Sequence, residues 1–221
     1  MKKYGISFAI CVLLNAVCTA QIPVSQESRH HKILENDHVR LLDVHIPPGD
    51  TTLFHIHATP SVFLILHNVR TGSQVISEED HSKSPIPHFG NMWFEGFYVK
   101  PRIHRVWNND SSEFHVMDIE LTNKNYVTIG EPVKQAPFKF LFDEKPVRAY
   151  RLDMNPATDI SIGISRADIL MILLTDSVSS VHVNKKDFQK KGDFLYVSSG
   201  TSIEAENKGK TEAAFAFFEL K

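Results

Sequence analysis

The chain has 221 residues, and its 24 Lys and Arg nearly balance its 26 Asp and Glu, which leaves a formal net charge of −2 at pH 7. This charge provides no electrostatic field that would hold phosphates, so the composition argues against nucleic-acid binding. Apolar residues make up 42% of the chain and include 15 Phe, enough for a hydrophobic core, which excludes disorder over most of the chain.

Residues 1–20 predict a secretory signal peptide. The chain starts with basic residues at Lys2 and Lys3, an apolar run follows over 6–17, and Ala20 provides a small residue for cleavage. The apolar run is too short to cross a bilayer of about 30 Å, and we expect no membrane span elsewhere. We therefore expect an exported protein, periplasmic or secreted, that keeps no cysteine after cleavage. The alternative interpretations of this segment are a buried N-terminal helix and a lipid anchor on Cys18.

From residue 39 onward, short runs of apolar residues alternate with turn residues, which is typical of β-strands. No amphipathic helix longer than about two turns is apparent. Short strands at regular spacing predict an all-β fold of the sandwich or barrel type. In the first half we expect strands over 39–46, 51–56, 61–67, 94–99, 103–107 and 114–121.

The two halves of the chain share a weak internal repeat. Phe63-Leu64-Ile65-Leu66 matches Met171-Ile172-Leu173-Leu174 at the same offset as Val39-Arg40 matches Val147-Arg148. The offset is smaller near the C-terminus, so we expect an insertion in the first copy, in the polar stretch 70–91. A chance match between alternating strands is the alternative interpretation.

The repeat predicts two tandem domains, over 33–122 and 140–221, with a linker over 123–138. Two small domains also fit the length of the chain.

Three histidines are candidate metal ligands. His55 and His57 alternate along one predicted strand, so both imidazoles lie on one face. His104 lies on another predicted strand. Imidazole binds Fe, Mn, Zn, Cu and Ni, and three such ligands leave positions open for water or substrate. A pair of exposed polar histidines is the alternative interpretation of His55 and His57.

The residues around these histidines resemble the cupin superfamily. Gly49, five residues and His55-x-His57 resemble the G-x5-H-x-H start of the first cupin motif, and His104-x3-Asn108 after Pro101 resembles the H-x3-N end of the second. The resemblance covers roughly 39–121, and the repeat extends it in weaker form to 221. It implies an all-β fold of two tandem jelly-roll β-barrels. It also implies a divalent transition metal inside the first barrel, held by His55, His57 and His104.

The sequence departs from the cupin motifs at two places. The glutamate of the first motif falls at Ser61 or Val62, and the glycine of the second motif is missing between Pro101 and His104. The usual site of three His and one Glu is therefore incomplete. An ion without a carboxylate ligand keeps its full charge, which favours an anionic substrate group. Glu95 is the nearest candidate to replace the missing acid.

The second copy lacks the three histidines. His55, His57 and His104 match Gly163, Ser165 and Ile203, whereas Asn108 matches Asn207. We therefore expect the second copy to be a degenerate barrel without metal ligands, which serves as a scaffold.

Four further residues are candidates for the surroundings of the site. Arg102 shares a strand face with His104 and is a candidate to pair with a substrate carboxylate, although a surface arginine fits equally well. Glu95, Asn108 and His115 complete this group as second-shell or substrate-binding candidates. We expect solvated loop positions for His30, His31, His38, His81 and His182.

Two classes of function are compatible with the resemblance. The first is a metal-dependent oxygenase, isomerase or lyase that acts on a small polar molecule. The second is a non-catalytic module that binds a small molecule or a sugar. The sequence contains no Gly-rich phosphate loop, no G-x-S-x-G and no C-x2-C. It leaves the metal, the substrate and assembly into a homo-oligomer open.

The signal peptide is directly testable. We expect the mature chain to begin near Gln21 because the basic, apolar and small residues before it form a cleavage signal. Mass spectrometry of the native protein measures the N-terminus, and an intact Met1 would contradict this prediction.

Overall fold

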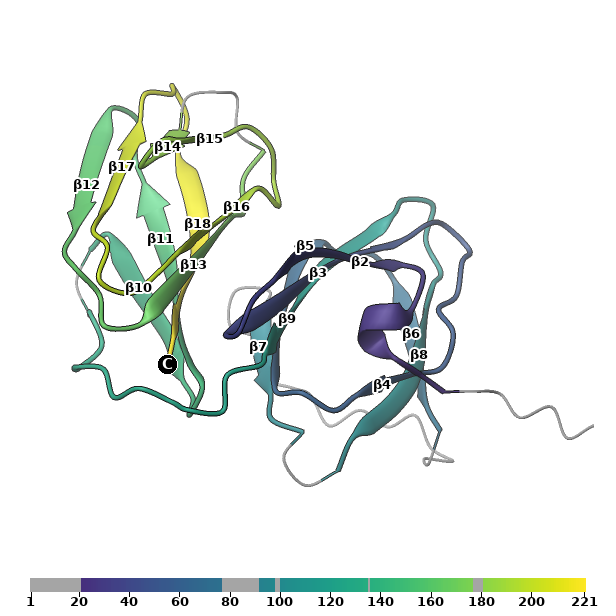
Figure 1. The fold of residues 1–221 in the computed structure, drawn as a ribbon. Helices are drawn as coiled ribbons and strands as arrows, with labels where there is room; N and C mark the ends of the chain where they lie inside the picture. The colour runs from purple at the N-terminus through teal and green to yellow at the C-terminus, as the bar shows by residue number, and fades with distance from the viewer. Residues whose placement is uncertain (1–20, 77–91, 98–99, 135, 177–180) are drawn as a thin grey trace, which may run out of the picture.

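The computed structural model describes residues 21–76, 92–97, 100–134, 136–176 and 181–221, and these form two β-barrels (Figure 1). The predicted signal peptide and most of the predicted insertion lie outside the described residues. No helix of the described segments is long and apolar enough to cross a membrane.

Two antiparallel sheets build the first barrel, in the orders β2-β3-β9-β5-β7 and β1-β4-β8-β6. Among the described strands of this barrel, only β1 pairs in parallel, alongside β4. The elements are β1 (Ile22–Pro23), the 3-10 helix η1 (Val24–Gln26), β2 (His30–Glu35), β3 (Val39–Ile46), β4 (His55–His57), β5 (Ser61–His67), β6 (Thr71–Val75), β7 (Met92–Glu95), β8 (Arg102–Asn108) and β9 (Phe114–Leu121).

The second barrel repeats this arrangement, with sheets in the orders β10-β11-β18-β13-β16 and β12-β17-β14-β15. The all-β fold of two tandem barrels predicted from the sequence is thereby confirmed. Its strands are β10 (Phe138–Asp143), β11 (Val147–Met154), β12 (Thr158–Ile162), β13 (Asp168–Leu173), β14 (Val181–Val183), β15 (Lys186–Phe188), β16 (Phe194–Val197), β17 (Ile203–Asn207) and β18 (Ala213–Leu220).

The first barrel differs at two points from the residue ranges that the repeat predicted. Strands β1 and β2 bring residues from 22 onward into the barrel, ahead of the predicted range 33–122. Within the stretch 70–91, residues 71–75 form β6, which pairs with β8 as β14 pairs with β17. Additional residues of the first copy therefore follow Val75.

The register around β4 corrects the predicted alignment of the two copies. The pairing slips by one residue between Thr51–Trp107 and His55–His104, whereas β12 pairs without a break up to Ile162–Ile203. Ile162, and not Gly163, is therefore the counterpart of His55. The same slip explains why the predicted strand over 51–56 is found only at residues 55–57.

Alternation along the central strands separates two cores. Leu42, Val44 and Ile46 of β3 face the interior of the first barrel. Val39 and Leu41 point the other way and join a core that both barrels share. This shared core also holds residues of the second barrel, namely Phe142, Val147, Ala149, Leu170, Ile172, Ala216, Phe218 and Leu220. The two five-stranded sheets thus pack against each other through their outer faces.

The shared core predicts that the barrels unfold together. Phe218 is fully buried in it, so Phe218→Ala should lower the free energy of unfolding by about 3–5 kcal/mol. Both tryptophans, Trp93 and Trp107, lie in the first barrel, so their fluorescence reports on that barrel alone. We expect this substitution in the second barrel to shift the denaturant midpoint of tryptophan fluorescence and of circular dichroism equally.

The control is Ile164→Ala, because Ile164 is 72% exposed and its loss should change the free energy of unfolding by no more than about 0.5 kcal/mol. A fluorescence midpoint that stays in place while the dichroism transition splits would show that the barrels unfold independently.

Candidate metal centre

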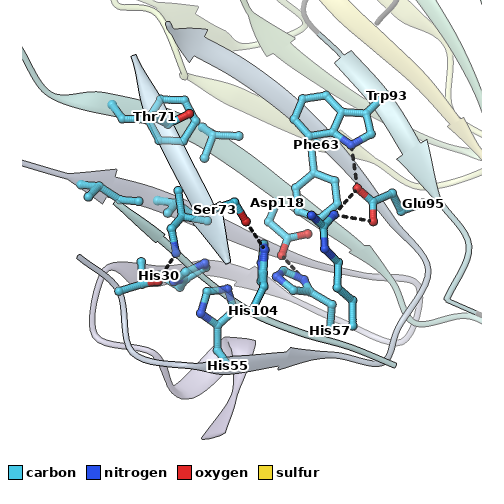
Figure 2. Close-up of a pocket in the computed structure, with 17 residues that line it drawn as sticks. His30, His55, His57, Phe63, Thr71, Ser73, Trp93, Glu95, His104 and Asp118 are labelled. Atoms are coloured by element: carbon cyan, nitrogen blue, oxygen red, sulfur yellow. Dashed lines mark hydrogen bonds and ion pairs between the residues drawn. The ribbon is translucent and has the colours of Figure 1, made fainter. Parts of the chain in front are cut away.

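Strands β4 and β8 bring the three candidate histidines together inside the first barrel. His55 lies directly opposite His104 in the antiparallel register, and alternation places His57 on the same inner face. The exposed fractions of His55, His57 and His104 are 1%, 2% and 8%. Their ring centroids lie 4.7–5.0 Å apart, and their ligand atoms all lie within 4.8 Å of one another (Figure 2).

Two of the three imidazoles have a hydrogen-bond partner at Nδ1. His55 donates from Nδ1 to the carbonyl oxygen of Leu53 at 2.8 Å. Nδ1 of His57 lies 3.4 Å from a carboxylate oxygen of Asp118, and Nδ1 of His104 lies 3.2 Å from the hydroxyl of Ser73. At His55 the carbonyl acceptor requires Nδ1–H and leaves Nε2 with its lone pair for a metal, whereas Nδ1 of His57 makes no hydrogen bond within the described residues.

The buried nitrogens fit a metal ion. Nε2 of His104 is buried and finds no hydrogen-bond partner among the described residues. Such a group costs about 1–3 kcal/mol when nothing satisfies it. A transition metal accepts an imidazole lone pair, so a divalent ion would satisfy this nitrogen together with those of His55 and His57.

Burial also keeps the three imidazoles neutral. It lowers the pKa of His55 to about 4 and lowers the pKa of His57 and of His104 well below the usual value. The neighbouring histidines lower these pKa values further, because a second positive charge in the same cavity is unfavourable. The neutral form is the one that binds metals, so the site is prepared for an ion at neutral pH.

Two acids line the cavity, and neither belongs to the group of three converging ligands. Glu95 accepts hydrogen bonds from Arg102 at 3.0 and 3.1 Å and from the indole of Trp93 at 2.9 Å. Asp118 is 1% exposed, and burial raises its pKa well above the usual value. Glu95 thus neutralises Arg102, and Asp118 stands behind His57.

Asn108 stabilises a turn. Its amide donates to the carbonyl oxygens of Ile46 and Ser112 at 2.9 and 2.8 Å. Asn207 makes the corresponding bonds to Met154 and Thr211 in the second barrel. This shared backbone role explains why the asparagine persists where the histidines do not.

The structure places His115 outside the cavity. It lies on the face of β9 that points away from the barrel interior, where Nε2 is 2.6 Å from Asp43. It therefore does not contribute to the surroundings of the three histidines.

Two residues that the sequence did not single out complete the site, and one of them corrects an expectation. His30, expected in a solvated loop, is buried at the start of β2 and packs edge-on against His55 with 4.8 Å between ring centroids. Its Nδ1 lies 2.9 Å from the carboxylate of Glu27. Both residues precede the cupin-like motif, so no motif signal marked them.

Glu27 organises one wall of the cavity. Its buried carboxylate also accepts hydrogen bonds from the backbone N–H of Arg29 and of Leu53. Because the carbonyl of Leu53 holds His55, Glu27 positions both His30 and His55. Burial opposes the charge on Glu27, but the hydrogen bonds outweigh it and lower its pKa to about 2.

The histidines open into a small cavity of about 180 Å³. Its polar side chains lie around the histidines and around the Glu95–Arg102 pair. The remaining walls are mainly apolar and are formed by Val44, Ile46, Phe63, Trp93, Val106, Phe114 and Val116.

No family model and no curated protein matches the sequence. Solved structures nevertheless share the fold at low identity. The bacterial pirin YhhW of Escherichia coli, solved in complex with nickel(II), is 13% identical with a TM-score of 0.60, and the match covers 86% of this chain and 90% of that chain. AerE from Microcystis aeruginosa is 8% identical with a TM-score of 0.56, with coverages of 88% and 98%.

A dioxygenase shares the same fold. Salicylate 1,2-dioxygenase from Pseudaminobacter salicylatoxidans is 10% identical with a TM-score of 0.54, and the match covers 83% of this chain and 71% of that chain. A cupin 2 conserved barrel domain protein from Leptotrichia buccalis matches over 86% of this chain with a TM-score of 0.52.

Ionised Glu27 should stabilise the fold in a pH-dependent way. Its pKa is lowered on folding, so its contribution is complete above about pH 4.5 and is lost as the pH falls towards about 2. Glu27→Gln should lower the free energy of unfolding by about 1–3 kcal/mol at pH 7. Denaturant titrations at several pH values measure this, and the variant should show the shallower dependence below pH 4.5. Parallel pH profiles of the two proteins would show that Glu27 has no such role.

Proposed function

Because the chain has the fold of two-barrel cupin proteins, we propose that it is an exported metalloprotein whose first barrel acts on a small polar molecule. The metal is a divalent ion of Fe, Mn, Zn, Cu or Ni on His55, His57 and His104. The observation that carries this proposal is the set of three neutral, buried imidazoles whose ligand atoms lie within 4.8 Å of one another. The signal-like residues 1–20 support export.

The ion supplies Lewis-acid or redox chemistry, which fits an oxygenase, an isomerase or a lyase. Three neutral ligands leave its charge uncompensated, so an anionic group of the substrate is the favoured partner. The apolar walls of the cavity exclude water around such a group, which strengthens the attraction.

His30 is suited to accept a proton inside the cavity. Glu27 occupies its Nδ1, so Nε2 is the nitrogen that remains for a bound molecule. A carboxylate that holds an imidazole in this way fixes its tautomer and its orientation. The pair thus provides the base that an isomerase or a lyase needs.

The substrate is small. The cavity of about 180 Å³ is lined by the aromatic rings of Phe63 and Trp93 and by the neighbouring Glu95–Arg102 pair, to which Trp93 is hydrogen-bonded (Figure 2). Because Glu95 already neutralises Arg102, a substrate carboxylate must compete with Glu95 for the guanidinium. The open positions of the ion, which have no such competitor, are the stronger anchor.

Removing one ligand tests the centre. Asp118→Asn changes a residue beside a ligand and should lower metal affinity by about 10–100-fold. His57→Ala removes a ligand itself and should lower metal affinity by more than that. Elemental analysis of protein purified without a His tag measures the metal, and circular dichroism checks the fold. The matched control is His182→Ala in the second barrel, which should leave the metal content unchanged.

Full metal occupancy in a folded His57→Ala variant would contradict the proposed ligand set. The same variants separate the two classes of function. Turnover of a small molecule that disappears with the metal supports an enzyme, whereas ligand binding that survives metal removal indicates a non-catalytic binding module.

A further inference from the structure

The outer face of the first barrel carries a second group of side chains able to bind a metal. Asp43 and His45 alternate on β3, and His115 of β9 lies directly opposite His45 in the strand register. The ligand atoms of these three residues lie within 4.8 Å of one another. We call Asp43, His45 and His115 the junction cluster. It lies on the outer face of the five-stranded sheet, whereas His55, His57 and His104 belong to the other sheet and point into the barrel.

In the junction cluster both imidazoles direct Nε2 at one carboxylate. Nε2 of His115 lies 2.6 Å from Oδ1 of Asp43, and Nε2 of His45 lies 3.1 Å from Oδ2. The two rings stack with 4.2 Å between their centroids. Nδ1 of His45 is held at 2.8 Å by Glu113. This outer carboxylate orients the ring and leaves Nε2 as the nitrogen available to an ion.

The junction cluster opens into a cavity of about 530 Å³ between the two barrels. His67 of β5 lines the same cavity, and Lys190, Lys191 and Gly192 approach from the second barrel. A Cβ atom on Gly192 would lie 3.5 Å from the His115 ring and 3.2 Å from side-chain atoms of the first barrel. The backbone of the second barrel therefore closes over one side of the cluster and leaves the other side open.

The charges around the junction cluster favour a cation. Burial opposes the negative charge of Asp43, but hydrogen bonds from the two histidines outweigh burial and lower the pKa of Asp43, so its carboxylate is ionised. Glu113 adds a second negative charge, and Lys191 is compensated by Asp176 at 3.3 Å. Although burial also opposes the charge on His45, its two acidic partners raise its pKa. A metal would take the place of that proton.

We propose that the junction cluster is a second metal site, which takes a divalent transition ion such as Zn²⁺ through Asp43, His45 and His115. Two imidazoles and one carboxylate form a ligand set that suits Zn²⁺, Ni²⁺ and Cu²⁺. The cavity leaves the remaining positions open to water or to an anion near the lysines of the second barrel. This site gives the second barrel a part in metal binding, although none of its own residues is a ligand.

Titration of the metal-free full chain with Zn²⁺ tests the proposal, with calorimetry for affinity and elemental analysis for stoichiometry. We expect the wild type to bind two ions at micromolar or tighter affinity. His115→Gln should bind one ion, His57→Ala should bind one ion, and the double variant should bind none. The matched control is His182→Ala, because His182 also pairs with an aspartate, Asp187, but on the exposed surface. It should keep both ions.

Asp43→Asn provides a second test if His115→Gln fails to fold, since it removes the carboxylate charge without changing the side-chain shape. Two ions bound by folded His115→Gln or by folded Asp43→Asn would overturn the junction site. A wild type that binds only one ion, which is lost in His57→Ala, would overturn it as well. A single ion that persists in His57→Ala and disappears in His115→Gln would support the junction site and would instead contradict the three-histidine centre.

Discussion

Strands β3, β5 and β9 carry apolar side chains on both faces, so the fold must bury both faces of their sheet. Strands alternate their side chains, so each of these three strands supplies one row to the barrel interior and another to its outside. The inner row surrounds the metal centre. The outer row, with Val39, Leu41 and Ile119 among its members, would expose a continuous apolar surface if the second barrel were absent. The second barrel therefore keeps a structural role without any ligand of its own.

The candidate metal centre shows that burial of three imidazoles carries an energetic cost. Three imidazoles in an apolar cavity lose hydration, and only two of them regain part of that loss through a hydrogen bond at Nδ1, His55 to a backbone carbonyl and His104 with a hydroxyl. The side that faces the cavity remains unsatisfied. Buried polar atoms of His57, His104 and Asp118 have no hydrogen-bond partner within the described residues, and at Nε2 of His104 an ion would relieve this deficit.

Local patterns in the sequence predicted the elements and residues that follow from local rules. The runs at 39–46 and 114–121 alternate over their whole length and were found as β3 and β9, and His-x-His placed both imidazoles on one face. Long-range pairing set the features that were missed. The register slip before β4, the burial of His30 over Glu27 and the outward orientation of His115 all depend on strands distant in sequence. No single-strand pattern encodes which face of β9 meets the second barrel.

The filled interior of the second barrel limits what that barrel could become. Tyr150, Phe188 and Phe215 are fully buried there, and Ile162 and Ile203 occupy the pair position that His55 and His104 occupy in the first barrel. Histidines at that pair would place polar rings among packed aromatic and aliphatic side chains. A histidine at either position would leave a polar imidazole in an apolar core, at a cost of about 1–3 kcal/mol if nothing satisfied it. Making this interior bind a metal would therefore require several substitutions at once, at the pair and among the side chains that pack around it.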